Sequence, residues 1–111
     1  ISGVTKGSPG HVLYSSSKAA INGLVKSLSL ELTKRNIRIN SISPGLIMTE
    51  SLYSKNTEIL SVEQKREYSS KYPLGIGDID SLNGTINFLF DDSSKWITGQ
   101  NIVVDGGNSN I

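Results

Sequence analysis

The chain of 111 residues contains no cysteine and a single histidine. Without cysteine, disulfide bonds, thiolate zinc sites and thiol catalysis are excluded for these residues, and His11 by itself cannot build a multi-histidine metal site. No apolar run approaches the roughly 20 residues that cross a membrane. We therefore expect neither a metal centre nor a membrane partner. The absence of cysteine is compatible with a reducing compartment without showing one, and the expected location is cytoplasmic.

An excess of charge of one sign is also lacking. The 11 Lys and Arg residues nearly balance the 10 Asp and Glu residues, which leaves a net charge of +1, and the lysines are scattered along the chain. Nucleic acids and anionic membrane surfaces are bound through concentrated positive charge, so neither is expected as a partner. The length and the ordinary apolar content suit one folded domain rather than two.

The stretch that carries chemistry is Tyr14-Ser15-Ser16-Ser17-Lys18. Residues four apart on a helix lie on one face, about one turn from each other. An ammonium beside a phenol favours the phenolate, which suits general acid–base chemistry on an alcohol or a carbonyl. This spacing also arises by chance, so a helix start with a half-buried tyrosine and a solvated lysine is the alternative interpretation.

Apolar residues at three- and four-residue intervals predict a helix from Leu13 to about Lys34, with Asn36 as its stop residue. The predicted apolar stripe consists of Ala20, Ile21, Leu24, Val25, Leu28 and Leu32. The opposite face is predicted to carry Asn22, Lys26, Ser29 and Thr33.

The isoleucine-rich segment 37–43 predicts a strand that ends at the Pro44-Gly45 turn, and 101–105 predicts a second strand. A helix followed at once by a strand is the second half of a β-α-β unit, whose ligands bind at the carboxyl ends of the strands. Two strands are too few for a stable sheet, and the chain starts at Ile1 without methionine. We therefore expect either more sheet ahead of residue 1 or extensive oligomerisation.

The polar segment 46–72 is interpreted either as a substrate lid or as a surface connection. Ser61 and Gln64 predict a capping box at the start of a short helix. A further helix follows, and either Asp78 or Asp80 is predicted to cap it. The tyrosines available to line a pocket are Tyr53, Tyr68 and Tyr72.

Four motifs then occur in order: Tyr14-x-x-x-Lys18, SPGLIMT at 43–49, PLG at 73–75 and WITGQNIVVDGG at 96–107. Together they resemble the carboxyl-terminal half of a short-chain dehydrogenase/reductase, in the compact single-domain branch that includes 3-oxoacyl-carrier-protein reductases. The resemblance implies an α/β fold, the carboxyl-terminal half of a doubly wound Rossmann-type parallel sheet in three α/β/α layers. Residues 1–111 would be the carboxyl-terminal portion of a single NAD(P)-binding domain, with the amino-terminal portion missing.

The resemblance also implies residue roles, with NAD or NADP as cofactor and a small carbonyl or alcohol as substrate. Tyr14 matches the catalytic acid/base, and Lys18 matches the lysine that tunes it and binds the nicotinamide ribose. Pro44 and Gly45 match the turn on which the nicotinamide stacks. The backbone of Ile47 would hold the carboxamide, and Thr49 would contact either the carboxamide or the pyrophosphate. A homodimer or homotetramer is expected for the full-length protein.

The departures from the family pattern leave alternatives open. The glycine-rich phosphate loop is absent, Ile76 stands where the family has arginine, and the catalytic serine is either Ser2 or the residue ahead of Ile1. A non-catalytic dinucleotide-binding or regulatory protein on the same fold, or a family epimerase or dehydratase, remains a competing interpretation. As the 111 residues alone, we expect little dinucleotide binding and no turnover.

Overall fold

The computed structural model describes residues 1–49 and 61–111. Helix α1 comes first and is extended by a short 3₁₀ helix, and the other helices and strands follow it along the chain. The elements are α1 (Val12–Leu32), η1 (Thr33–Arg35), β1 (Ser41–Pro44), α3 (Val62–Lys71), α4 (Asp80–Phe90), η2 (Asp92–Ser94), β2 (Asn101–Val104) and η3 (Asn108–Asn110).

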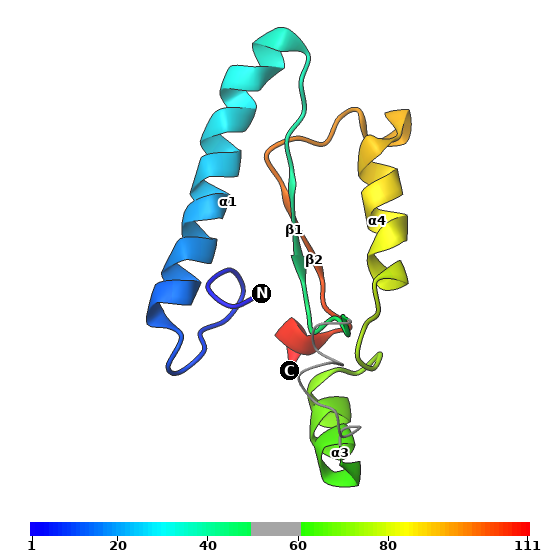
Figure 1. The fold of residues 1–111 in the computed structure, drawn as a ribbon. Helices are drawn as coiled ribbons and strands as arrows, with labels where there is room; N and C mark the ends of the chain where they lie inside the picture. Colours follow the sequence, from blue (N-terminus) through cyan, green and yellow to red (C-terminus); the bar gives the residue numbers. More distant parts are fainter. Residues whose placement is uncertain (50–60) are drawn as a thin grey trace.

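Strands β1 and β2 pair in parallel, with Ser41 opposite Asn101 and Pro44 opposite Val104. Helices α1 and α4 lie on opposite sides of this strand pair, as Figure 1 shows. Parallel neighbours need a crossover connection, and here α3 and α4 lie within it. The predicted α/β class, with helices on both faces of a parallel sheet, is confirmed.

Helix α1 ends as its sequence predicts. Asn36 adopts the left-handed conformation, with φ 57°. Its N–H donates to Thr33 O at 3.0 Å, and the next N–H, from Ile37, donates to Leu32 O at 3.2 Å. This pair of bonds is the Schellman arrangement, which satisfies two carbonyls at the helix end and turns the chain toward β1.

The face that α1 presents to the sheet differs from the predicted stripe. Ser29, predicted on the polar side, is buried, whereas Leu24 is 57% exposed. Gly99 explains the difference, because a Cβ there would lie 2.6 Å from Ser29 Oγ, so only a small side chain fits. The Ser29 hydroxyl donates to Lys26 O at 2.7 Å, which lowers the cost of its burial. The predicted stripe was wrong for Ser29, and also for Ala20, Ile21 and Leu24, which are exposed.

Strand β1 begins at Ser41, four residues later than predicted from segment 37–43. Ahead of it, one backbone bond, from Gly99 N to Ile39 O at 2.7 Å, is joined by side-chain bonds in place of a regular ladder. The Asn40 amide donates to Ile97 O at 3.0 Å, and its oxygen accepts from Gln100 N at 3.0 Å. An amide side chain that pairs with the neighbouring backbone competes with regular strand pairing, which explains the shorter strand.

Helix α3 begins with the predicted capping box. Gln64 N donates to Ser61 Oγ at 3.2 Å, and Ser61 N donates to Gln64 Oε1 at 2.9 Å. The segment from Glu50 to Leu60, into which the predicted lid extends and which includes Tyr53, lies outside the described residues.

Of the two aspartates predicted to cap α4, Asp78 makes the bond. Ser81 N donates to Asp78 Oδ1 at 2.9 Å, and Asp78 N donates to Ser81 Oγ at 3.1 Å. The Ser81 side-chain hydrogen bond, followed by its backbone hydrogen bond, holds the pKa of Asp78 below its ordinary value. Asp80 instead accepts from the Asn83 amide, within the first turn of the helix.

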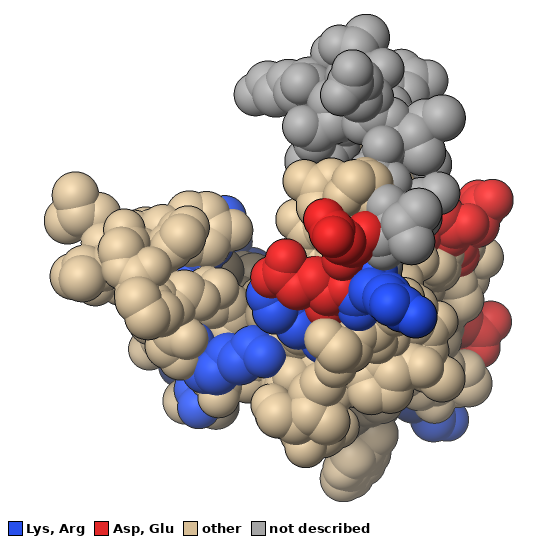
Figure 2. All heavy atoms as spheres, turned by 90° about the horizontal axis from the view of Figure 1, so that it is seen from below, with Lys and Arg blue, Asp and Glu red and all other residues tan. Residues whose placement is uncertain are grey.

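Over residues 1–49 and 61–111, every helix is too short or too polar to span a membrane. The same residues contain no cluster of three or more potential metal-ligating side chains. Acidic and basic side chains lie next to each other on the face drawn in Figure 2 and form no field of one sign there.

Candidate active site

The first turns of α1 bring Tyr14 and Lys18 together. Lys18 Nζ lies 5.3 Å from the centroid of the Tyr14 ring. Both residues are exposed, Tyr14 by 52%, so the phenol is open to a ligand while its ring stays within reach of the ammonium. This geometry is the i, i+4 contact that the sequence spacing predicts.

His11, which is exposed, lies just ahead of this helical turn and contacts Tyr14. Its ring meets the Tyr14 ring edge to face, with centroids 6.2 Å apart and planes at 81°. His11 Nδ1 lies 3.0 Å from Pro9 O, and because a carbonyl only accepts, this nitrogen donates. The structure thus places His11 beside the phenol, at the exposed end of the loop.

The loop ahead of α1 packs on the helix start. Gly3 has φ +79°, and a Cβ there would lie 2.1 Å from Ser15 O. The Ser2 and Ser8 hydroxyls are 2.8 Å apart, which closes the loop on itself. Ser2 therefore lies in a loop in which the following residue, Gly3, contacts Ser15, the residue after Tyr14. Ser2 and the residue ahead of Ile1 both stay predicted alternatives for the catalytic serine.

The carboxyl end of β1 lies near this loop. The Ile1 nitrogen donates to Pro44 O at 3.4 Å. The loop ahead of α1 thus contacts the end of β1 as well as the first turn of α1.

The chain after Pro44 needs glycine. Gly45 N donates to Val104 O at 2.9 Å, which extends the pairing of the two strands by one bond. A Cβ at Gly45 would lie 2.8 Å from Asp105 Cα, so any larger residue would push the two strand ends apart.

Ile47 forms an isolated parallel bridge with Gly77. The bonds run from Gly77 N to Leu46 O at 3.1 Å and from Met48 N to Gly77 O at 2.8 Å. In such a bridge the neighbours of Ile47 make the bonds, and its own N–H and C=O are directed away from Gly77. Thr49, exposed, is the last described residue of this segment.

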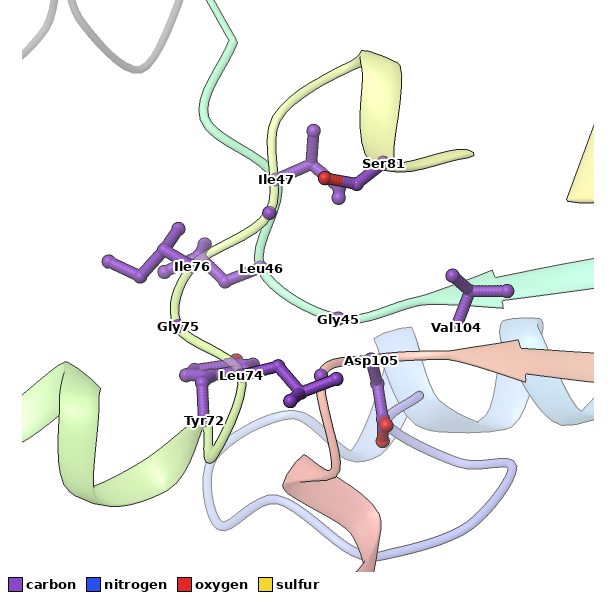
Figure 3. A pocket seen from close by; sticks show the side chains of 12 residues that line it. Gly45, Leu46, Ile47, Tyr72, Leu74, Gly75, Ile76, Ser81, Val104 and Asp105 are labelled. Atoms are coloured by element: carbon purple, nitrogen blue, oxygen red, sulfur yellow. The ribbon is translucent and has the colours of Figure 1, made fainter. Parts of the chain in front are cut away.

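A cavity of about 200 Å³ opens between this segment, the 72–77 turn and the end of β2. Figure 3 shows Ile47 and Ser81 on one side, with Tyr72 and Leu74 on another. Tyr72 thus lines a cavity as predicted for the tyrosines, and Tyr68, on α3, is half-buried. The walls are largely apolar, and they include Gly45, Leu46, Ile76 and Val104.

A family model described as enoyl-(acyl carrier protein) reductase matches residues 1–109. This match covers nearly the whole chain. The chain belongs to the short-chain dehydrogenase/reductase family. The family resemblance of the four sequence motifs is therefore confirmed, and with it the Rossmann-type fold.

Individual members of the family support the assignment. The 3-oxoacyl-(acyl-carrier-protein) reductase FabG of Chlamydia trachomatis is 41% identical over 103 residues, which cover 92% of this chain and 40% of that protein. A structure of a 4-hydroxyisoleucine dehydrogenase mutant complexed with NADH and succinate is similar at TM-score 0.77 and 35% identity, covering 88% of this chain and 40% of the other. ElxO with NADP bound is similar at TM-score 0.80 and 32% identity, with 96% and 42% covered. The chain thus spans less than half the length of these relatives.

Two residues that tie the short-chain dehydrogenase/reductase chain together were not predicted from sequence. Lys6 was one of several scattered lysines, and Asn108 stood in the polar tail after Gly106-Gly107. The structure joins them by a hydrogen bond of 2.9 Å from Lys6 Nζ to Asn108 O. No local pattern signals a contact between residues 102 positions apart.

Proposed function

We propose that the protein containing this chain is an NAD(P)-dependent oxidoreductase that interconverts a carbonyl and a secondary alcohol by hydride transfer. The observation that carries the proposal is the exposed Tyr14 phenol with the Lys18 ammonium 5.3 Å from its ring centroid. Membership of the short-chain dehydrogenase/reductase family supports it, as do similar structures that hold NADH and NADP.

Tyr14 would give a proton to the carbonyl oxygen in reduction and take it from the alcohol in oxidation. The Lys18 ammonium would lie beside the reacting phenol as a positive charge, and it would also bind the nicotinamide ribose. When bound, the nicotinamide supplies or accepts the hydride. The protein's own contribution would be to hold the substrate oxygen at Tyr14 with the reacting carbon near the nicotinamide.

The segment after β1 suits the nicotinamide end of the cofactor. The missing side chain of Gly45 lets this turn pack against Asp105 at the end of β2, and the turn would be the surface on which the nicotinamide ring stacks. Ile47 has its N–H and C=O directed away from Gly77, and these two groups match the acceptor and donor of a carboxamide. Thr49 would add a hydroxyl contact at the same end.

We further propose that residues 1–111 form the carboxyl-terminal portion of one Rossmann domain, whose phosphate-binding loop precedes them. The chain carries no glycine-rich phosphate loop, and it spans 40% of its Chlamydia relative. On this proposal, the residue that selects NAD or NADP lies outside this chain. We also propose that the complete protein is cytoplasmic and forms a homodimer or homotetramer.

The test uses the protein expressed from its complete natural reading frame, assayed with a panel of carbonyl compounds and either NADH or NADPH. Tyr14→Phe is expected to lower turnover by about 10²- to 10⁴-fold while cofactor binding is retained, because only the proton donor is removed. Tyr68→Phe, the same substitution on α3, is the matched control. Undiminished turnover in Tyr14→Phe would contradict the proposal. Cofactor binding without turnover of any carbonyl by the native protein would favour a non-catalytic binding protein.

A further inference from the structure

The turn that follows β2 contacts two segments that flank the proposed site. Asn108 is 4% exposed. Its backbone oxygen accepts from Lys6 Nζ at 2.9 Å, and its side-chain amide donates to Lys71 O, the last residue of α3, at 2.5 Å. One buried residue thus connects the loop ahead of α1 with the end of α3.

The turn itself is held by Asp105, which is 8% exposed. Its two carboxylate oxygens accept from Gly107 N at 3.0 Å and from Ser109 N at 2.8 Å. Burial acts to raise the pKa of Asp105, but these hydrogen bonds and the charge of Lys6 outweigh it and hold the pKa below its ordinary value. Figure 3 shows the carboxyl group directed away from the cavity.

On one side, the turn is fixed to a wall of the cavity. Leu74 N donates to Gly106 O at 3.0 Å. A Cβ at Gly107 would lie 3.2 Å from the Pro73 ring, so the two segments are in close contact. The turn is therefore bonded to the cavity wall at 72–77 and packed against it.

On the other side, Lys6 belongs to the loop that packs under Tyr14. Gly3 N donates to Lys6 O at 2.9 Å, and Ser2 forms a bridge with Lys6. Gly3 also rests on the backbone of Ser15. The Lys6 backbone thus fixes the Ser2–Gly3 segment, while its side chain reaches the turn.

We propose that Lys6 is a positioning residue, whose ammonium tethers the loop that carries Ser2 to the turn at 105–110. The tether keeps the loop beside Tyr14 in a fixed place relative to the cavity wall. A charge-assisted hydrogen bond suits this role because it is stronger than a neutral one, and the Asp105 carboxylate nearby stabilises the ammonium. The inference rests on the proposed function, since it concerns the alignment of that site.

The experiment compares Lys6→Met, Lys6→Arg and the native protein, each from the complete natural reading frame, with Lys34→Met on η1 as the control. Lys6→Met is expected to lower kcat about tenfold with the KM for cofactor nearly unchanged, because a displaced loop misaligns the reacting groups. Lys6→Arg keeps the charge and the donor, so it should restore kcat. Hydrogen exchange at the Gly3 and Thr5 amides should be faster in Lys6→Met and native-like in Lys6→Arg.

Native kcat and native exchange in Lys6→Met would overturn the tether. If Lys6→Met does not fold, Lys6→Arg decides, since a loss of kcat or of loop protection there also contradicts the proposal. Hydrogen exchange needs no turnover, so it tests the tether even if Tyr14→Phe shows that the proposed function is wrong.

Discussion

The start of α1 and the turn after β2 differ in the burial and hydrogen bonding of their polar side chains. Tyr14 is 52% exposed and Lys18 is also exposed, and the contact between them is between an ammonium and a ring face. Asp105 and Asn108 are buried, and each hydrogen-bonds to backbone groups. Side chains that keep hydrogen-bonding capacity toward solvent are available to a ligand, whereas those bonded to backbone hold the fold.

This difference predicts how substitutions divide between activity and stability. Changes at the start of α1 should lower turnover and leave the free energy of unfolding nearly constant. Changes in the turn after β2 should lower the free energy of unfolding first. This division between activity and stability can be tested in the complete protein by substitutions at three positions: Lys18, Gly3 and Asp105.

The largest effect is expected for Lys18→Met. Loss of the ammonium removes the positive charge beside the phenol and the proposed contact to the ribose, so turnover should fall by about 10²- to 10⁴-fold. Because the side chain is exposed, the thermal midpoint should stay close to that of the native protein. Lys26→Met, two turns further along α1, is the control. A lower thermal midpoint with native turnover in Lys18→Met would contradict the assignment of the start of α1 to activity rather than stability.

Gly3→Ala tests the support beneath Tyr14. The new Cβ would meet Ser15 O at 2.1 Å and would sit on a left-handed backbone. We expect a loss of about 2–4 kcal/mol in the free energy of unfolding, measured by urea denaturation, because clash and strain add. Gly7→Ala is the matched control, since a Cβ there meets no atom within 4 Å. Equal stability of the two variants would show that the loop is not held on α1.

Asp105→Asn should have the smallest effect, about 1–3 kcal/mol at neutral pH, because the amide can replace only part of the bonding of the carboxylate. A carboxylate whose folded pKa is lowered stabilises the fold above its unfolded pKa, near 3.9, and this contribution is lost as the pH falls through the folded pKa. The stability difference between variant and native protein should therefore shrink in acid. Asp92→Asn is the control, and a difference independent of pH would contradict the assignment.

Much of this fold follows from local sequence. Four features depend on residues within a few positions of each other: the helix over residues 12–32, its Asn36 stop, the capping box at Ser61 and the glycine turn after β2. The approach of Lys18 to Tyr14 is equally local, because one helical turn sets it. Local geometry is repeated in every chain with the same pattern, so it can be predicted.

Other features depend on which segments meet. Ser29 is buried because Gly99 approaches it closely, and β1 starts late because the Asn40 side chain pairs with the chain across from it. The roles of Pro44, Gly45, Ile47 and Thr49 stay predictions, resting on the family and on the backbone directions at the end of β1.

Local sequence patterns specify the helices, the turn chemistry, the tyrosine–lysine pair and the family. The face of α1 that meets the sheet, and the bond from Lys6 to Asn108, depend instead on how distant segments pack. Helical periodicity and capping are set by bonds that span three to five residues. A contact across 102 positions exists only after the parallel strands have brought both ends of the chain to one edge.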